Sequence, residues 1–428
     1  MSTPQNIIII GASVAGHNAV NELIPHLPST HRILLIDALA YSSWPIASLR
    51  AAVVPGWEKR VTQPLTKEAI FPAGSIHQVI APNKVVELRE SSVVLEHPFE
   101  GSTEVPFFKA IVATGASQGI PMRPVAGSSE AEYQAALVKY QEDFARSKKV
   151  LIVGGGAVGL ELAGELREQH PDQEITIVHA KSHVLDPTAD VPRTDAGHHS
   201  YSSPPTPLKL SKTIESQLAA LHINLILSDR VSIPSAGSVS DPSAWDGSVG
   251  AQSGIKTVKL DSGKVVQADF VFISTGNRPN VSLVQNADPK ALSSGLIAVD
   301  EYLRIVSTNP KSVLTSNYYA AGDAASAPGW KTSQGAQAEG AGAAANILAE
   351  VRGKPVKPFA RPRPDAMFIP LGSKGGAGAL PLPLLGVVSA PSFLVSAGKG
   401  KKLFVEDGFY GRYKGSKKPV APPVTVQA

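Results

Sequence analysis

The chain has 428 residues, enough for two or three domains, and its 43% hydrophobic and 18% charged residues are typical of a soluble globular protein. It contains no cysteine, which excludes disulfide bridges, thiolate zinc sites and a redox-active dithiol. The net charge of +4 is too small to indicate nucleic-acid binding, and we expect no nucleic-acid partner.

The N-terminal region has the pattern of a strand, a glycine turn, a helix and a second strand. The apolar run Ile7–Ile10 leads into Gly11-Ala-Ser-Val-Ala-Gly16, and a second apolar run ends in Asp37. Small residues at such a turn let the backbone approach a pyrophosphate at the helix N-terminus. The sequence therefore predicts a dinucleotide site, although Ser13 stands where the usual fingerprint has its second glycine. The predicted contacts are Gly11, Ser13, Ala15 and Gly16.

A second copy of this pattern lies about 140 residues further on. The apolar strand Val150–Val153 leads into Gly154-Gly-Gly-Ala-Val-Gly159 and a helix of small residues, and the next strand is Ile175–Val178. One such turn is weak evidence, but two predict a flavin site and a nicotinamide site in the same chain. The predicted contacts of the second turn are Gly154, Gly156, Val158 and Gly159.

The remaining segments predict further strands, helices and insertions between and after these two units. We expect antiparallel strands over 76–97, one strand over Val105–Val112, a helix over Ser129–Arg146, insertions at 186–208 and 234–254, a helix carrying Leu210, Ile214 and Leu218, a strand at Phe270–Ile273, and an Ala/Gly-rich helix reaching Glu350. The section after Pro355 has no clear pattern.

Four features in this order resemble the FAD/NAD(P)-dependent pyridine nucleotide oxidoreductase superfamily. They are Gly11–Gly16, Ala113-Thr-Gly115, Gly154–Gly159 and Ala321-Gly-Asp323. Three local matches resemble its apoptosis-inducing-factor-like group, which includes the ferroptosis suppressor flavoproteins and fungal homologues. These matches are Trp44–Val53, Ile177-Val-His179, and Lys331, eight residues after Asp323. The resemblance covers about residues 1–350 and extends only loosely over 360–428.

The resemblance implies an α/β fold with two Rossmann-like, glutathione-reductase-like domains, the NAD domain being inserted in the FAD domain, and a small C-terminal α+β domain. The implied boundaries are 1–117 with 276–354 for FAD, 118–275 for NAD(P)H and 355–428 for the C-terminal region. The implied activity is reduction of a quinone-like acceptor by NADH, NADPH or both, through FAD.

The flavin site is expected to combine two carboxylates with a guanidinium. Asp37 ends a strand and can accept both ribose hydroxyls, whereas its alternative is a surface aspartate. Asp323 can bind the ribityl hydroxyls at a helix start, or serve only as an N-cap. Arg50 resembles the family's pyrophosphate-binding arginine, with a solvated surface arginine as the alternative. The other expected contacts are Ala113, Thr114, Gly115, Gly276, Arg278 and Gly322.

Glu161 and Lys331 are the candidate catalytic residues. Glu161 is a charged residue among Gly159, Leu160, Leu162 and Ala163, which is out of place unless it faces a site. Lys331 near the flavin edge would stabilise reduced, anionic flavin, and we expect it to pair with Glu161. The alternatives are an exposed helix glutamate and a surface lysine.

The ribose pocket of the nicotinamide nucleotide that faces the end of the second unit's strand is expected to accept NADPH as well as NADH. An NAD-specific site would place a carboxylate at the end of Ile175–Val178, whereas this chain has His179-Ala-Lys181. Lys181 could attract a 2′-phosphate. No metal site is predicted, because His183, His198 and His199 lack a ligand set.

The C-terminal tail interleaves lysines with apolar residues between Lys399 and Lys418. We favour a domain edge with a solvated basic end; the alternative is peripheral contact with an anionic membrane surface, where a hydrophobic quinone is found. A signal peptide and an apolar span are absent, so we expect a cytoplasmic protein, or one peripheral to a membrane or lipid droplet.

Two other functions use the same cofactors. One is a tailoring oxidoreductase of secondary metabolism, and the other is a signalling or DNA-binding flavoprotein of the apoptosis-inducing-factor type. A disulfide reductase is excluded because no Cys-x4-Cys pair exists. The sequence predicts neither the acceptor nor the oligomeric state.

Overall fold

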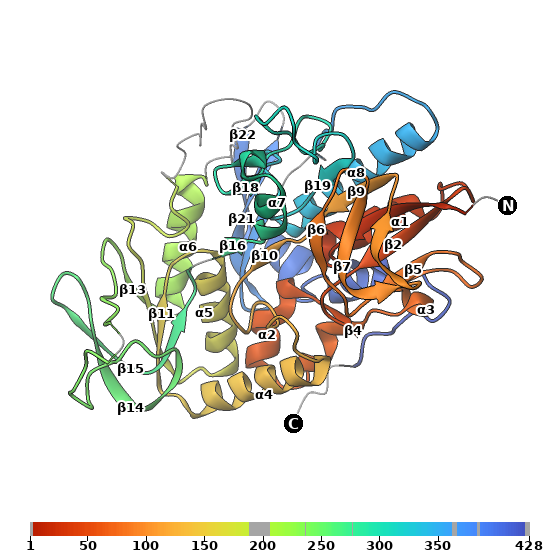
Figure 1. Ribbon diagram of the computed structural model, residues 1–428. Helices are drawn as coiled ribbons and strands as arrows, with labels where there is room; N and C mark the ends of the chain where they lie inside the picture. The colour runs from red at the N-terminus through yellow and green to blue at the C-terminus, as the bar shows by residue number, and fades with distance from the viewer. Residues whose placement is uncertain are drawn as a thin grey trace.

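The protein is built around two five-stranded sheets, one fully parallel and one with a single antiparallel edge strand, and helices pack on both of them (Figure 1). The computed structural model describes residues 3–187, 206–235, 237–275, 277–361, 366–382 and 386–423. The first sheet has the strand order β19-β9-β1-β2-β5, and its central strand contains four consecutive buried isoleucines. Its strands are β1 (Gln5–Ile10), β2 (His31–Ile36), β5 (Gln78–Ile80), β9 (Lys109–Val112) and β19 (Tyr318–Ala320). A run of residues buried on both faces is typical of a central parallel strand.

Two helices cover this first sheet and cross at close range. They are α1 (Val14–Leu23) and α8 (Ser333–Val351). A Cβ added at Gly340 of α8 would overlap the carbonyl group of Ala15 in α1, so only glycine permits this approach. The sheet and its helices form the largest apolar core of the molecule.

The second sheet has the order β13-β12-β11-β15-β14 and lies at the left of Figure 1. Its edge strand β14 is antiparallel to β15, whereas the other three neighbours pair in parallel. The strands are β11 (Lys149–Val153), β12 (Glu174–Val178), β13 (Asn224–Ile226), β14 (Gly250–Lys259) and β15 (Val265–Ile273), and the helices are α5 (Ala157–Gln169) and α6 (Leu208–Ala220).

The chain passes between the two sheets twice, and the two crossings are paired. The short strand β10 (Ala116–Ser117) is antiparallel to β16 (Arg278–Pro279). Helix α4 (Glu130–Arg146) follows the first crossing and begins at a capping box formed by Ser129 and Glu132. It runs along the lower edge in Figure 1 and packs against α2 (Ser48–Val53) and β14.

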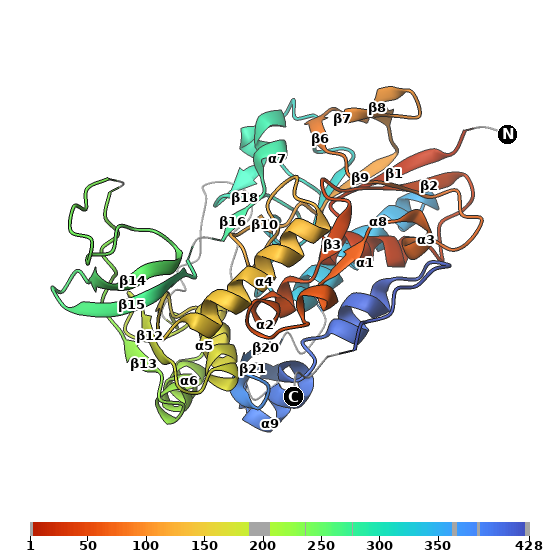
Figure 2. The same ribbon diagram turned by 90° about the horizontal axis from the view of Figure 1, so that it is seen from below.

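The C-terminal region contacts both sheet units. Its antiparallel strands are β20 (Met367–Leu371), β21 (Gly375–Leu382) and β22 (Gly386–Ala390), and α9 (Ser392–Val395) follows them. Strand β20 packs so closely on α5 that a Cβ at Gly164 would overlap the backbone of Leu371. The chain then returns to the first unit, where Phe409 stacks on Trp44 at 5.5 Å. Figure 2 shows this segment along one side of the molecule.

The remaining elements are short and connect these units. They are β3 (Tyr41–Ser43), β4 (Thr62–Pro64), α3 (Lys67–Ile70), β6 (Val85–Leu88), β7 (Ser92–Phe99), β8 (Ser102–Pro106), α7 (Ser282–Ala287), β17 (Leu292–Ser293), β18 (Leu296–Ile297), the 3-10 turns Pro45–Ala47, Glu58–Arg60, Pro289–Ala291 and Tyr410–Arg412, and the π-helical turns Ser396–Gly400 and Val405–Phe409. None of the helices in the described ranges combines the length and apolar character that crossing a bilayer requires.

The predicted fold class is confirmed, with corrections in four segments. Antiparallel strands were expected over 76–97, but residues 78–80 form β5, which pairs in parallel with β2. Residues 105–112 are not one strand: β8 ends at Pro106 in an antiparallel sheet, and β9 begins at Lys109 in the parallel one. The predicted insertion at 234–254 contains the start of β14 and the buried Trp245, which is 3% exposed. The insertion predicted at 186–208 lies mostly outside the described residues. The domain boundaries stay a prediction.

The last correction concerns the aromatic residues of the tail, which we considered for a membrane surface. Phe409, Tyr410 and Tyr413 are 0%, 6% and 1% exposed and belong to the core of the first unit. Phe404 differs, with 38% of its surface exposed. Most aromatic side chains of the tail therefore anchor it to the protein itself, whereas the flanking residues Lys401, Lys402, Lys414, Lys417 and Lys418 are exposed.

Candidate functional site

The first glycine turn closes tightly between β1 and α1. Gly11 has a φ of +106°, and a Cβ there would overlap the carbonyl oxygen of Ala113 at the end of β9. A Cβ at Gly16 would overlap the carbonyl oxygen of Gly11. Neither position accepts a larger residue without moving backbone. The turn thus brings the end of β1, the start of α1 and Ala113 together.

The second turn repeats this geometry between β11 and α5. Gly154 has a φ of +114°, and a Cβ at Gly159 would overlap the carbonyl oxygen of Gly154. Gly156 differs, because a Cβ there would meet no atom within 4 Å. The open side of this glycine is where a pyrophosphate would approach the backbone.

Both helix N-termini are open to an anion. Ser13 caps α1 and Gly156 caps α5; neither helix has a side-chain cap hydrogen bond or an acidic residue in its first turn. The first N–H groups of a helix have no partner within it, and the helix dipole adds positive potential there. Both turns therefore fit a dinucleotide pyrophosphate, and Ser13 leaves the first one intact.

Asp37 lies beside the first turn, as predicted. Its carboxylate accepts hydrogen bonds from the backbone N–H of Ala12 at 2.6 Å and of Leu39 at 2.9 Å. Burial raises the pKa of Asp37, and these two hydrogen bonds oppose that rise. The glycine turn itself orients the carboxylate, which keeps lone pairs for ribose hydroxyls.

Thr114 and Gly115 form the joint between the two chain crossings. The Thr114 hydroxyl donates to the carbonyl of Asn280 at 2.7 Å, and the Asn280 side-chain amide donates to the carbonyl of Thr114 at 2.9 Å. The Asn280 backbone N–H donates to the carbonyl of Gly115 at 2.9 Å. Arg278 is exposed in β16 beside this joint, and Gly276 lies outside the described residues.

Asp323 lies in a turn after β19, not at the helix start that we predicted. Helix α8 begins ten residues later, at Ser333, with Thr332 as its N-cap. Gly322 has a φ of +82°, and its N–H donates to the Glu339 carboxylate at 2.8 Å. Arg123 lies 3.4 Å from the Asp323 carboxylate. The turn, rather than a helix end, positions the carboxylate.

Lys331 donates hydrogen bonds to backbone carbonyl groups of this turn. Its ammonium donates to the carbonyl of Ala325 at 2.6 Å and to the carbonyls of Gly322 and Ala327 at 3.3 Å. Burial lowers the pKa of Lys331. The Glu339 carboxylate, 3.9 Å away, raises this pKa and so opposes the effect of burial. The predicted pairing with Glu161 is wrong, because the two side chains do not form an ion pair. Sequence analysis missed Glu339, a charged residue flanked by alanine and glycine in α8, although the same kind of signal had singled out Glu161.

Glu161 pairs instead with Lys399 from the C-terminal region. Their charged atoms are 2.6 Å apart, and the side chains are 13% and 16% exposed. Burial raises the pKa of Glu161, and the nearby Lys399 ammonium opposes this rise. Lys399 also donates to the carbonyl of Phe368 in β20, so the C-terminal sheet holds it in place.

Arg50 forms a buried ion pair with Glu165 on α5. The two hydrogen bonds are 2.7 and 2.8 Å, and both side chains are 5% exposed. The guanidinium also donates to the carbonyl of Lys401 at 3.1 Å and lies over the ring of Trp57. The prediction placed Arg50 at the flavin pyrophosphate; in this structure it joins the first unit, α5 and the C-terminal region.

The pocket for the 2′-phosphate of NADPH is less basic than predicted. The His179 ring nitrogen Nδ1 accepts the N–H of Gly155 at 3.1 Å, and burial lowers the pKa of His179. The uncharged imidazole ring therefore packs against the backbone of the second turn. Lys181 is 53% exposed and lies 3.4 Å from Asp186, a carboxylate seven residues after His179 that partly neutralises it. NADPH use alongside NADH stays a prediction.

Two open dinucleotide turns in one chain define a two-nucleotide flavoprotein. The chain belongs to the pyridine nucleotide-disulphide oxidoreductase family, whose sequence pattern matches residues 5–340. The protein is therefore an oxidoreductase of the family that uses FAD and NAD(P)H, as the two turns predicted.

Several characterised proteins are similar along most of the chain. Human ferroptosis suppressor protein 1 is 25% identical over 382 residues, which cover 88% of each chain. Apoptosis-inducing factor homolog B of Dictyostelium discoideum is 24% identical over 419 residues, covering 95% of this chain and 96% of the relative. An FAD-dependent oxidoreductase of Flammulina velutipes is 25% identical over 280 residues, covering 65% and 74%.

Solved structures share the fold at lower identity. A NAD-dependent persulfide reductase from A. fulgidus aligns with a TM-score of 0.60 and 19% identity, over 88% of this chain. Reduced Bacillus anthracis CoADR-RHD aligns with a TM-score of 0.62 and 17% identity, over 90% of this chain. The alignments span 64% and 62% of those two chains. These likenesses support the fold alone.

We expect Lys399→Met to slow reduction of the bound flavin by NAD(P)H much more than it lowers FAD content. The substitution leaves the Glu161 carboxylate buried without its cation. This changes the electrostatic potential at the start of α5, next to the second glycine turn. Rapid mixing under anaerobic conditions measures the rate, and extraction measures FAD. Lys402→Met is the matched control, because Lys402 is exposed and makes no ion pair with a described residue. Equal rates in both variants would contradict the expectation.

Proposed function

We propose that the protein is an FAD-dependent NAD(P)H oxidoreductase that passes electrons to a quinone-like acceptor. The observation that carries the proposal is the pair of open glycine turns in a chain without cysteine. When bound, the flavin accepts hydride from the nicotinamide and returns electrons to the acceptor, so the protein supplies binding and orientation. The resemblance to the ferroptosis suppressor group supports the choice of a quinone.

The residues of the chain divide this work between the two units. The backbone at Gly11–Gly16 and the carboxylates of Asp37 and Asp323 hold the FAD, and the backbone at Gly154–Gly159 holds the nicotinamide nucleotide. Arg50, through Glu165, fixes α5 and its glycine turn relative to the first unit. The residues thus set the mutual orientation of the two nucleotides, on which hydride transfer depends.

The lack of cysteine limits the acceptors that can take electrons from the reduced flavin. Disulfide reductases pass them from the flavin to a protein dithiol, and this chain has no thiol to receive them. Electrons must therefore reach an external acceptor directly from the flavin. A planar acceptor that takes two electrons, such as a quinone, suits that requirement.

An anaerobic acceptor screen tests the proposal. The FAD-loaded protein is reduced with NADH or NADPH, and flavin reoxidation is followed after short-chain quinones, persulfides or oxygen are added separately. We expect bleaching with either nucleotide and fastest reoxidation by quinones. Bleaching without quinone reoxidation would overturn the acceptor, and product analysis would then test the tailoring reaction. A protein that cannot be loaded with FAD would overturn the whole proposal.

A further inference from the structure

A hollow of about 820 Å³ lies between the C-terminal segment and the first unit, and it shares no lining residue with either glycine turn. Trp57 and Arg60 form one wall, and residues 401–423 supply the remainder. Its lining residues are Trp57, Arg60, Lys401, Lys402, Glu406, Tyr410, Gly411, Tyr413, Lys414, Lys418 and 419–423. It is thus a second concave site, separate from the flavoenzyme chemistry.

The charge of this hollow is strongly one-sided. Its lining carries five cationic side chains and one carboxylate, a net charge equal to the +4 of the whole chain. The cations are Arg60, Lys401, Lys402, Lys414 and Lys418. The four lysines are exposed, and none forms an ion pair with a described residue, whereas Arg60 pairs with Glu406. Like charges gathered around a concavity repel one another, and an anion at the centre relieves that repulsion.

Arg60 forms a rigid inner wall. Its side chain is 6% exposed, and its guanidinium lies 4.7 Å from the centre of the Trp57 ring. The Arg60 Nε atom is buried and has no hydrogen-bond partner. Because Arg60 lines the hollow, its guanidinium adds a fixed positive charge to the inner wall.

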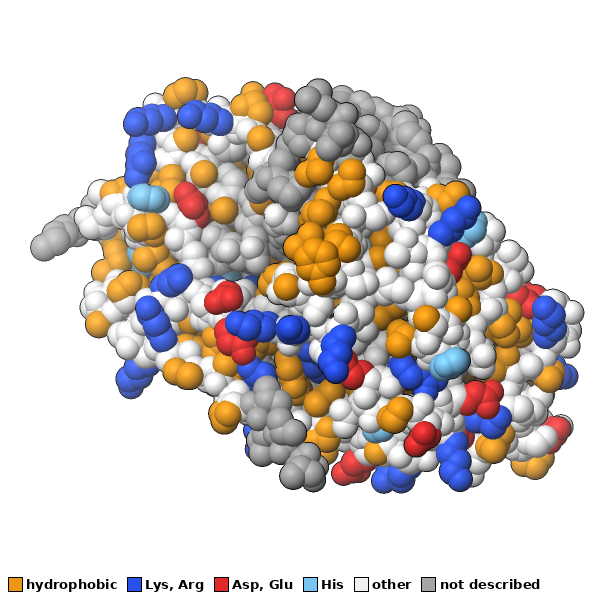
Figure 3. Space-filling view, turned by 180° about the vertical axis from the view of Figure 1, so that it is seen from behind, with side chains coloured by type: hydrophobic (Ala, Val, Ile, Leu, Met, Phe, Trp, Pro, Cys, Tyr) orange, Lys and Arg blue, Asp and Glu red, His pale blue; other side chains and the backbone are white. Residues whose placement is uncertain are grey.

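Figure 3 views the molecule from the side on which the C-terminal segment runs. Lys and Arg side chains form a short row near the middle of this face, with a few acidic side chains beside them and hydrophobic side chains above them. The segment that lines the hollow is held firmly, because Trp44 donates to the carbonyl of Leu403 at 2.8 Å and Gln63 donates to the Tyr410 hydroxyl at 2.7 Å. The cations are therefore presented on a fixed backbone.

We propose that this hollow binds a phosphate-bearing anion. Several ammonium groups can surround a tetrahedral, multiply charged group from different directions, whereas a single carboxylate would match only one or two of them. The volume is within the range of small-ligand sites. The phosphate can come from a soluble phosphate ester or from a phospholipid headgroup, and both sources present the same chemistry to the lysines.

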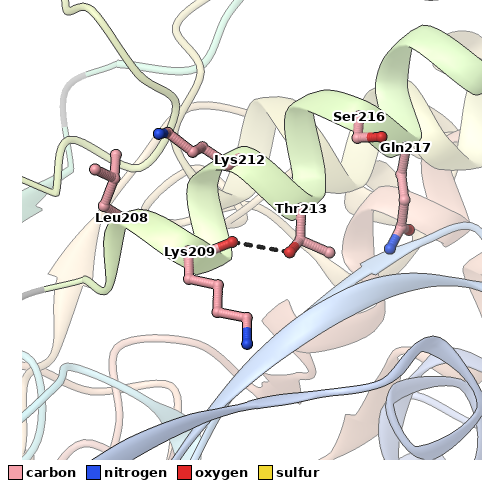
Figure 4. A pocket seen from close by; sticks show the side chains of 6 residues that line it. All are labelled: Leu208, Lys209, Lys212, Thr213, Ser216 and Gln217. Carbon is pink, nitrogen blue, oxygen red and sulfur yellow. Dashed lines mark hydrogen bonds between the residues drawn. The ribbon is translucent and has the colours of Figure 1, made fainter.

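The test uses the FAD-loaded full chain and two variants of equal charge change. Lys402→Gln with Lys418→Gln removes two cations from the hollow. Lys209→Gln with Lys212→Gln removes two exposed cations from a separate hollow along α6, shown in Figure 4. The probes are inorganic pyrophosphate, measured by calorimetry, and phosphatidylcholine vesicles with or without phosphatidylinositol 4-phosphate, measured by co-sedimentation.

We expect wild-type binding to at least one phosphate probe, weakened at least about tenfold in the first variant and unchanged in the control. Pyrophosphate binding identifies a soluble ester as the source, and binding only to phosphoinositide vesicles identifies a headgroup. Equal weakening in both variants, or no binding of either probe by the wild type, overturns the proposal. Neither result affects the acceptor screen, because the variants leave both glycine turns unchanged.

Discussion

Gly156→Ala should leave the protein folded but weaken NAD(P)H binding by at least about tenfold, or 1.4 kcal/mol. The added methyl group meets no protein atom within 4 Å, so the turn and α5 can form unchanged. Replacing glycine by alanine at an N-cap costs up to about 1 kcal/mol of helix stability, which a protein of this size tolerates. The methyl group would instead occupy the space through which a pyrophosphate reaches the backbone N–H groups.

Gly159→Ala is the matched comparison, three residues further along the same turn. Its Cβ would overlap the carbonyl oxygen of Gly154, so β11 and α5 would have to separate. We expect loss of stability together with loss of nucleotide binding. Steady-state KM values for NADH and NADPH, FAD content and thermal unfolding separate the two variants. Unchanged KM values in Gly156→Ala would show that the nucleotide does not approach this side of the turn.

Most of the fold could be predicted because it depends on local sequence. The buried strand at Ile7–Ile10, its glycine turn and the following helix are contiguous, and the same holds for Val150–Val153 and its turn. The errors arose where the pattern was interrupted or short. The segment from Val105 to Val112 is apolar enough for one strand. However, strand β8 of one sheet ends at Pro106, and strand β9 of another sheet begins at Lys109.

The site could be predicted only in part, because its ion pairs join distant segments. Glu161 was found by its position just after a glycine turn and Asp37 by its position at the end of a strand, and both signals are local. The partner of Glu161 is 238 residues away, in the region with no clear pattern. The same family resemblance that located Lys331 suggested a wrong partner for it. The carbonyl groups that Lys331 contacts carry no sequence signal at all.

Arg50→Met should destabilise the protein by about 3–5 kcal/mol at neutral pH, because it leaves the Glu165 carboxylate buried without a cation. Burial raises the pKa of Glu165, and the Arg50 guanidinium is the main group that opposes the rise. The folded variant therefore binds a proton more readily than the unfolded chain. Its stability falls as the pH rises from the unfolded pKa, about 4.3, through the raised folded pKa, and the deficit shrinks again in acid.

Two further variants distinguish this role from a contact with the flavin pyrophosphate. Combining Arg50→Met with Glu165→Gln removes both charges and should restore most of the lost stability, because a neutral pair of similar size replaces the ion pair. Glu90→Gln is the control, because Glu90 is exposed and forms no ion pair with a described residue, and it should behave like the wild type. Denaturant unfolding at acidic and neutral pH gives the free energies, and flavin absorbance gives the FAD content. If Arg50 served the pyrophosphate, both Arg50 variants would lose FAD equally and Glu165→Gln alone would retain it. If the ion pair is its role, the double variant should keep its flavin, since the two units then remain in the same relative position.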